Sequence, residues 1–275
     1  MKFPVAIQLY SLRDDMAVDF EGTLKKVKEL GFDGVEFAGL FDKSPKEVKA
    51  LCEENGLVPI SAHVPYVDML ENPDKVIGDY AEIGCKYIVI PYMTEEHRPG
   101  VPNYDEVIEN VKVLGETANR FGMKLLYHNH DFEFVKIGDE YGLDVLYNSV
   151  DSDLLQTELD TCWVNVGGEN PSEYIIKYTG RAPVVHLKDF VMGNGSKGNM
   201  YKLIGIDDGE SEQADGEGFS FRPVGYGVQD FEAILKASEK AGAEWVVIEQ
   251  DDPAMGKTPV ECAEMSIEYI NTINK

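Results

Sequence analysis

The chain has 275 residues, of which 25 are basic and 50 are acidic, so its formal net charge at pH 7 is −25. A charge of this size repels phosphate backbones and anionic lipid surfaces, and it argues against nucleic-acid and membrane-surface partners. No apolar run approaches the roughly 20 residues of a membrane helix, and the start, "MKFPVAIQLYSLRDD", lacks a signal-peptide core. No CxxC pair occurs among the four cysteines, so we expect reduced thiols in a cytoplasmic protein (Cys52, Cys85, Cys162 and Cys262).

A unit of helix, glycine and strand recurs along the chain after a first predicted strand, "PVAIQLY". The unit is clear in "LKKVKELGFDGVEFAG" (24–39), where an amphipathic segment ends at a glycine and a short apolar run follows. Continuous runs such as "YIVI" and "WVVI" are typical of parallel strands buried on both faces. A strand without the glycine is predicted at "LLQTELD" (154–160). The helix-closing glycines are Gly31, Gly56, Gly84, Gly122, Gly180 and Gly242.

Eight strands alternating with helices, without a convincing linker, predict one (β/α)8 TIM barrel over residues 1–275. A doubly wound open sheet is the alternative fold. That fold usually carries a glycine-rich phosphate loop after an early strand, and "IQLYSLRDD" contains no glycine. The segment 190–228 breaks the repeat, because it is rich in Gly, Asp and Ser. We interpret it as an insertion after strand seven, which is either a variable surface loop or an active-site lid.

Ionisable residues follow the predicted strands at a regular place. In a TIM barrel the carboxyl ends of the strands converge on one opening, so these side chains are expected to meet there. Like charges packed together are costly unless a cation neutralises them, and we therefore predict a divalent metal ion among them. Imidazole and carboxylate ligands suit Mn, Mg, Co or Zn. The strand-end residues are Glu36, His63, His128, Asp160, His186 and Glu249.

Residues two apart on a strand share a face, so each strand end offers a second group beside the first. The pairs are His128 with His130, His186 with Lys188, and Glu249 with Asp251.

At these residues the sequence resembles the xylose-isomerase-like TIM barrels, a superfamily of sugar isomerases and epimerases. The resemblance covers essentially the whole chain, through "IQLYSLR", "LGFDGVEF", "SAHVPY", "YHNHDFEF", "ELDTCW", "VVHLKD", "VGYGVQDF" and "VIEQD". It implies a divalent metal held by Glu, Asp, His and Glu. Asp160, His186 and Glu249 match the last three of these ligands. For the first, either His128 replaces the glutamate or Glu133 reaches back from the loop, and we favour Glu133.

The resemblance also implies the roles of the other residues. His128, His130, Lys188 and Glu249 are the candidate catalytic groups, for proton transfer or oxyanion stabilisation. Contacts with sugar hydroxyl groups are expected from Glu36, His63 and Asp251.

The resemblance implies a metal-dependent sugar isomerase or epimerase, which abstracts a proton next to a carbonyl and forms an enediolate on a keto-sugar or inosose. One alternative is a dehydratase or lyase of the inosose dehydratase or 3-keto-glycoside type, which uses the same enolisation. A non-catalytic sugar-binding barrel is another. A phosphodiesterase fits poorly, because the negative charge opposes DNA and those relatives use more histidines. A small-molecule carbohydrate is the expected partner, and a homodimer is the default assembly.

Overall fold

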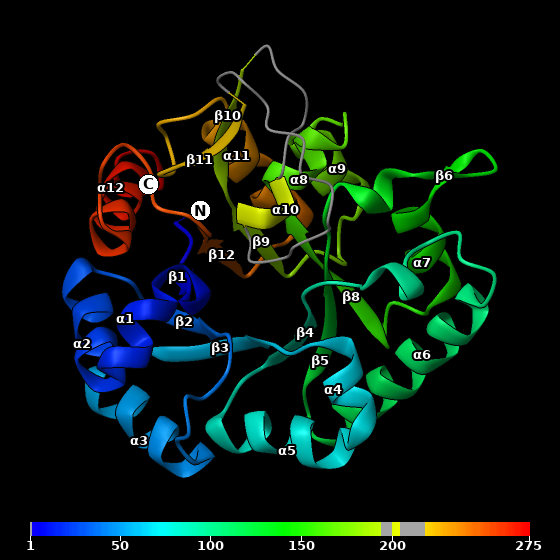
Figure 1. The fold of residues 1–275 in the computed structure, drawn as a ribbon, viewed down its shortest axis with the longest axis horizontal. Helices are drawn as coiled ribbons and strands as arrows, with labels where there is room; N and C mark the ends of the chain where they lie inside the picture. Colours follow the sequence, from blue (N-terminus) through cyan, green and yellow to red (C-terminus); the bar gives the residue numbers. More distant parts are fainter. Residues whose placement is uncertain (1, 194–199, 204–217) are drawn as a thin grey trace.

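The computed structural model describes residues 2–193, 200–203 and 218–275. Eight short strands form its centre (Figure 1). They are rich in β-branched and other apolar residues, as strands covered on both faces should be. Their bounds are β1 (Val5–Gln8), β2 (Gly34–Phe37), β3 (Val58–His63), β4 (Tyr87–Ile90), β5 (Lys124–His128), β8 (Leu155–Asp160), β9 (Val184–Leu187) and β12 (Trp245–Ile248).

These strands close into a barrel in the order β1-β12-β9-β8-β5-β4-β3-β2, and all neighbours pair in parallel. Each barrel strand therefore lies beside the barrel strands that precede and follow it along the chain. The predicted (β/α)8 TIM barrel is confirmed, and the open sheet is excluded because the first and last strands pair with each other.

Helices surround the barrel (Figure 1). In α2 (Phe20–Leu30) the side chain of Asp19 caps the first turn by accepting from the backbone N–H of Gly22. The helix ends at Gly31, whose φ of 98° is left-handed and favours glycine. The other surrounding helices are α1 (Arg13–Val18), α3 (Pro45–Asn55), α4 (Tyr66–Glu71), α5 (Pro73–Ile83), α6 (Tyr104–Arg120), α7 (Gly142–Ser149), α8 (Thr161–Val166), α9 (Pro171–Lys177), α11 (Phe231–Ala241) and α12 (Pro259–Ile273).

Short elements lie in the loops of the barrel. Three are 3-10 turns, and two form a small antiparallel hairpin between β5 and α7. They are η1 (Leu9–Leu12), η2 (Glu95–His97), η3 (Phe132–Phe134), β6 (Lys136–Ile137) and β7 (Glu140–Tyr141). Among the described residues, no helix has the length and apolar character to cross a membrane.

The predicted insertion at 190–228 contains an antiparallel hairpin. Its two strands are β10 (Asp189–Met192) and β11 (Phe219–Arg222). A short helix, α10 (Met200–Leu203), is also described. Residues 194–199 and 204–217 of the segment lie outside the described residues, so the lid stays a prediction.

Candidate active site

The position of the candidate site follows from the alternation of side chains along the barrel strands. A small cluster of buried apolar residues, which includes Leu126, Val184 and Val247, fills the barrel interior. Because side chains two apart share a face of a strand, the next inward residues on β5, β9 and β12 are those two positions further on. The polar layer of the site therefore lies directly above the apolar core, and it is made of His128, His186 and Glu249.

One more step of two residues brings His130, Lys188 and Asp251 into a cavity of about 400 Å³ at the barrel mouth. The polar lining of this cavity is His63, His128, His130, Lys188, Glu249 and Asp251. The rest of the described lining is largely apolar or aromatic: Tyr10, Ala38, Gly39, Pro65, Pro91 and Tyr92.

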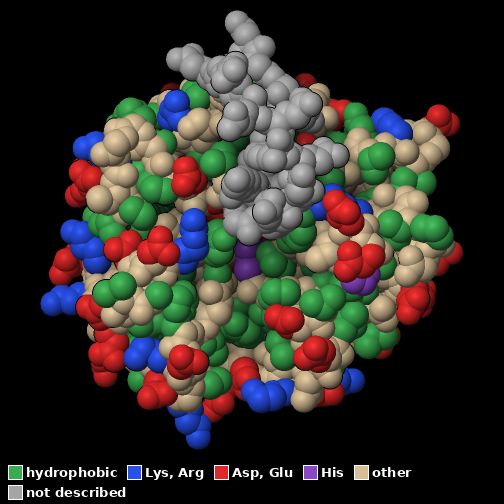
Figure 2. All heavy atoms as spheres, viewed as in Figure 1, with side chains coloured by type: hydrophobic (Ala, Val, Ile, Leu, Met, Phe, Trp, Pro, Cys, Tyr) green, Lys and Arg blue, Asp and Glu red, His purple; other side chains and the backbone are tan. Residues whose placement is uncertain are grey.

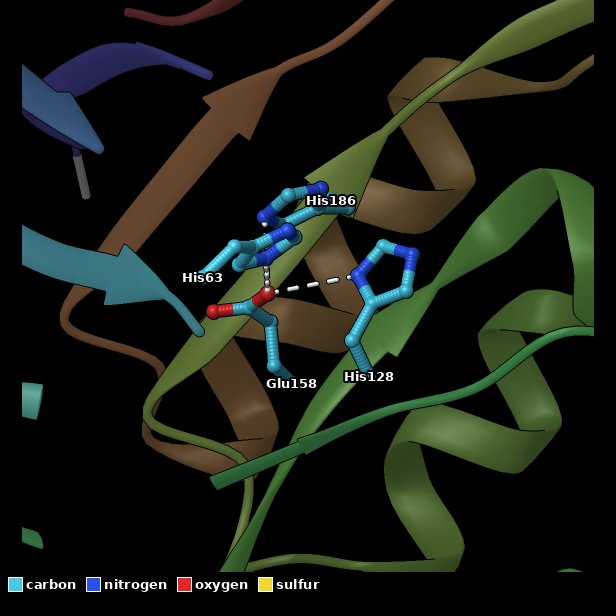
Figure 3. Close-up of side chains that lie close together, drawn as sticks. All are labelled: His63, His128, Glu158 and His186. Atoms are coloured by element: carbon cyan, nitrogen blue, oxygen red, sulfur yellow. Dashed lines mark hydrogen bonds and ion pairs between the residues drawn. The ribbon is translucent and has the colours of Figure 1, made fainter. Parts of the chain in front are cut away.

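Three imidazoles surround one carboxylate oxygen at the floor of the cavity (Figure 3). Oε1 of Glu158 lies 2.6 Å from Nε2 of His63, 3.2 Å from Nδ1 of His128 and 3.0 Å from Nε2 of His186. Oε2 of Glu36 lies 3.1 Å from the same nitrogen of His63 and 2.8 Å from that of His186. Side chains from β2, β3, β5, β8 and β9 thus meet at one point of the barrel axis.

A second group of possible metal ligands shares His128 and His186 with the cluster around Glu158. It consists of His128, Asp160, His186 and Glu249. One ligand atom from each of these four residues lies within 4.8 Å of the others, and all four side chains are buried. His186 and Glu249 are also in direct contact, since Nδ1 of the imidazole is 3.0 Å from Oε2 of the carboxylate.

Asp160 carries the atom that best tests whether this group fits a metal ion. Its Oδ1 accepts from the backbone N–H of Trp163 at 2.9 Å, which caps α8. Its Oδ2 is buried and has no hydrogen-bond partner among the residues that the structure describes. The closest cationic or imidazole nitrogens, on Lys188 and His128, are 3.6 and 3.7 Å away. A buried carboxylate oxygen is costly without a partner, and two carboxylates with two imidazoles are an N/O donor set that suits a divalent ion. His128, Asp160, His186 and Glu249 therefore fit a divalent metal ion.

Lys188 lies beside this group with its ammonium held by carboxylates. Its Nζ is 2.7 Å from Oδ2 of Asp251 and 3.0 Å from Oε2 of Glu249. Burial lowers the pKa of Lys188, but these two carboxylates and Asp160 more than compensate, so its pKa is well above the ordinary range. Lys188 is thus a buried ammonium facing the cavity, and not the exposed lysine that its residue type alone suggests.

Burial and neighbouring charges shift the pKa values of the carboxylates and imidazoles of the site. Burial lowers the pKa of His63, yet Glu36 and Glu158 raise it to about 10. Burial raises the pKa of Asp160 to about 6 and that of Asp251 to about 7, against the attraction of Lys188. Burial, together with the nearby imidazoles or Lys188, holds the pKa of His128 and His130 well below the ordinary range. Such strongly perturbed groups are typical of functional sites.

Glu133, the favoured first ligand of the sequence analysis, is not brought together with the other three. Its carboxylate is turned away into the protein, where it accepts from Tyr127 Oη–H at 2.5 Å and from the backbone N–H of His130 at 2.8 Å. The fourth position beside Asp160, His186 and Glu249 is occupied by His128, the alternative that the sequence left open.

Glu36 was expected to contact sugar hydroxyl groups, but it is fully buried and is not among the residues that line the cavity. Gln8 Nε2–H and Ser61 Oγ–H donate to its carboxylate at 2.8 and 2.5 Å. Its position below His63 and His186 makes it a support for those imidazoles. His63 and Asp251, the other two expected contacts, do line the cavity.

Sequence reasoning missed Glu158, Tyr10 and Tyr92. Glu158 could have been found, because it lies two residues before Asp160 on the same strand and the same spacing was used for the neighbouring strands. Tyr10 likewise follows Gln8 by two residues. Tyr92 lies in the loop after β4, where no spacing rule applies.

Comparison with known proteins places this chain in a family. Residues 24–273 match the family model described as xylose isomerase-like TIM barrel. The inosose dehydratase of Clostridium beijerinckii is 28% identical in an alignment of 277 positions, which covers 91% of this chain and 88% of the relative. The inosose dehydratase of Geobacillus kaustophilus is 26% identical over 274 residues, covering 91% and 86%.

A similar fold occurs in a crystal structure of a sugar phosphate isomerase/epimerase from Parabacteroides distasonis. The TM-score is 0.77 at 20% identity, and the match covers 98% of this chain and 94% of that one. Because the family match spans most of the sequence and the strands close into a barrel, the chain belongs to the xylose isomerase-like TIM barrel family.

Proposed function

We propose that the protein is a divalent-metal-dependent enzyme that removes a proton next to the carbonyl group of a keto-sugar or inosose. The observation that carries this proposal is the buried group of His128, Asp160, His186 and Glu249, with an Asp160 oxygen that lacks a hydrogen-bond partner among the described residues. These four side chains would hold Mn, Mg, Co or Zn. When bound, the ion polarises the carbonyl and stabilises the negative charge that develops on its oxygen.

The residues above the ion-binding group are placed to handle the substrate. His130 and Lys188 line the cavity beside it and are the groups we assign to proton transfer. Lys188 offers its ammonium N–H groups to a developing oxyanion or a departing hydroxyl, while Asp251 and Glu249 hold it in place. His63 and Asp251 are assigned to sugar hydroxyl groups, and Glu36 and Glu158 to positioning the imidazoles from below.

The fate of the proton decides the class of the enzyme. Its return to the neighbouring carbon isomerises the sugar, and its return to the opposite face epimerises it. Loss of a β-hydroxyl, which leaves as water after gaining a proton, makes the enzyme a dehydratase. The sequence analysis favoured an isomerase or epimerase, but the relatives that are 26–28% identical over most of the chain are inosose dehydratases. Dehydration is therefore the second candidate, and this similarity supports it.

The four cysteines are all buried and unpaired, which fits the cytoplasm that we propose as the location.

The experiment is an exchange assay on protein with defined metal content. The protein is stripped with chelator, reloaded with Mn, Mg, Co or Zn, and incubated with inososes and keto-sugars in deuterated water. We expect solvent deuterium to enter a carbon beside the carbonyl only when metal is present, and the NMR spectrum of the products to separate isomerase, epimerase and dehydratase. Absence of stoichiometric metal and of C–H exchange would instead favour the non-catalytic sugar-binding barrel.

A further inference from the structure

The indole of Trp163 lies against the residues to which we assign proton transfer, but Trp163 is not among the described residues that line the cavity. It stands in the first turn of α8, three residues after Asp160, and its backbone N–H donates to Oδ1 of that carboxylate at 2.9 Å. Figure 2 shows a histidine among hydrophobic side chains at the centre of this face of the molecule, whereas the indole is fully buried. Any effect of the indole on the reaction therefore passes through its neighbours.

The first neighbour is the imidazole of His130. It lies beyond the end of β5, so the barrel strand does not fix its side chain. The indole and the imidazole have centroids 5.2 Å apart and are inclined at 32°. Phe132 stacks on the same imidazole at 5.5 Å, and Tyr92 meets it edge-on at 5.2 Å. Aromatic rings attract one another at these separations, so His130 takes its orientation from ring contacts, and Trp163 supplies the one that comes from α8.

The second neighbour is the ammonium of Lys188. Its Nζ lies 5.6 Å from the centre of the Trp163 ring and 5.4 Å from that of Phe221. Asp251 and Glu249 hold the same nitrogen at 2.7 and 3.0 Å. A ring face attracts a cation at such distances without taking up its N–H groups as a carboxylate oxygen does. The carboxylates and the rings together thus fix the ammonium at the cavity wall.

The β10–β11 hairpin holds the indole in place. Phe219 stacks on Trp163 at 5.8 Å with the ring planes 8° apart, and Phe221 meets the indole edge-on at 6.1 Å. Phe190 stacks in turn on Phe219 at 5.3 Å. These side chains belong to a buried cluster that is separate from the main core. Rotation of the indole would displace these rings, so the ring that contacts His130 and Lys188 has a defined position.

From these contacts we propose that Trp163 is a positioning residue for the proton transfer. By touching both His130 and Lys188, the indole sets where the imidazole and the ammonium stand relative to each other and to the bound substrate. Proton transfer depends on such placement, and a displacement of about 1 Å can cost about 10²-fold in rate. The inference rests on the proposed function and adds to it a residue outside the cavity.

The kinetic test uses two substitutions of this residue. Trp163→Met removes the rings but keeps a large apolar side chain, and Trp163→Phe keeps an aromatic ring. Deuterium exchange is measured in metal-loaded protein over a range of 2-keto-myo-inositol and methyl 3-keto-β-D-glucopyranoside concentrations. In Trp163→Met we expect kcat to fall by about 10²-fold and KM to change by less than about threefold, because the indole does not touch the substrate. Trp163→Phe should recover at least about tenfold of this loss.

Two kinetic results would overturn the inference. One is a kcat for Trp163→Met within threefold of the wild type, and the other is a rise in KM alone, which would make the indole a substrate contact. Metal content should stay at the wild-type value in both variants, since the N–H that donates to Asp160 belongs to the backbone.

The other tryptophan provides the matched control. Trp245 is partly buried at the start of β12 and packs on the apolar cluster inside the barrel. Trp245→Met removes the same rings, so it should also lower the free energy of unfolding in urea, but its kcat should stay within about threefold of the wild type. An equal loss of kcat in Trp245→Met would reduce Trp163 to a packing residue.

A spectroscopic measurement decides the inference without using activity. The protein is labelled with 13C-histidine and loaded with Mg or Zn, and the Cε1–H signal of His130 is assigned with His130→Gln. We expect ring currents to displace this signal in the wild type, and we expect it to move in Trp163→Met, to move less in Trp163→Phe, and to stay in Trp245→Met. A signal that is unchanged in both Trp163 variants overturns the inference. Absence of exchange in the wild type would contradict the proposed function, while this measurement would still show whether Trp163 holds His130.

Discussion

Asp160 and Asp189 are buried carboxylates at the same end of the barrel, yet their surroundings differ completely. Asp189 accepts from four backbone N–H groups, those of Phe190, Gly225, Gly227 and Gln229, at 2.7–3.2 Å. Asp160 accepts from a single backbone N–H and leaves its other oxygen without a hydrogen bond within the described part of the chain. Both side chains are almost fully buried.

The difference teaches how to separate a structural carboxylate from a functional one. Asp189 holds the "VGYG" loop in place, and Gly227 is required there because a Cβ would lie 2.2 Å from Oδ1 of Asp189. Its hydrogen bonds are complete within the protein. Oδ2 of Asp160, by contrast, has no hydrogen-bond donor among the described residues, as expected of an oxygen that binds an ion. Burial is the same for both residues, so the count of partners distinguishes them.

The largest expected effect is on activity, from Asp160→Asn. Asparagine still caps α8 through its side-chain oxygen, so the fold should be kept. Loss of a charged ligand should lower metal affinity and slow deuterium exchange by about 10³-fold, or about 4 kcal/mol in activation free energy. The free energy of unfolding of the metal-free protein should stay the same or rise, since one buried charge is gone. Exchange within tenfold of the wild type, with metal still bound, would remove Asp160 from the metal site.

Asp189→Ala should instead destabilise the protein. It leaves four backbone N–H groups without their acceptor, and we expect the free energy of unfolding, measured with urea, to fall by about 3 kcal/mol. Asp189→Asn, which keeps one accepting oxygen, is the matched control and should lose less. If neither variant loses stability but both lose exchange, Asp189 belongs with Asp160 and the distinction between the two carboxylates is wrong.

Removal of the metal provides an independent view of the same distinction. At free metal one hundred times above its dissociation constant, binding should stabilise the folded state by about 2.7 kcal/mol, so chelation should lower the melting temperature. The shift should be preserved in Asp189→Asn and lost in Asp160→Asn. An equal shift in both variants would show that the ion binds elsewhere.

Most of the fold was predictable because its signals are local. A glycine that closes a helix and a run of Val and Ile can be recognised within about ten residues, and β8 was found without its glycine from "LLQTELD" alone. The residues of the polar layer were predictable for the same reason, since spacing of two along a strand decides which face a side chain takes. Asp160, His186 and Glu249 are brought together by the closed barrel, as that spacing required.

The loop after β5 was harder to predict, because β5 ends at His128 and Glu133 lies well beyond that end. Beyond that residue the chain turns into η3, and the direction of the Glu133 side chain depends on Tyr127 and on a backbone N–H that only the folded loop positions. The resemblance implies three carboxylates and one imidazole around the metal, and this ligand set favoured Glu133 over His128. The structure places His128, and not Glu133, beside the other three expected ligands.

The smallest expected effect comes from Glu133→Gln and is seen in the pH dependence of stability. Burial raises the pKa of Glu133 from 4.5 to about 8, although Tyr127 Oη–H and His130 N–H lower it. The folded state therefore keeps a proton that the unfolded state has lost between these values. Its contribution to stability is complete below about pH 4.5 and is lost as the pH rises through 8.

Between pH 6 and 7 this one group should lower the free energy of unfolding of the wild type by up to about 1.4 kcal/mol. Glutamine has no proton to lose, so urea unfolding of Glu133→Gln should lack this slope. Metal content of the variant is the control: it should be unchanged if His128 is the ligand. Parallel pH profiles of the wild type and the variant would mean that Glu133 is ionised in the folded protein, as expected of a carboxylate beside a metal ion. Loss of metal from the variant would restore Glu133 as the first ligand.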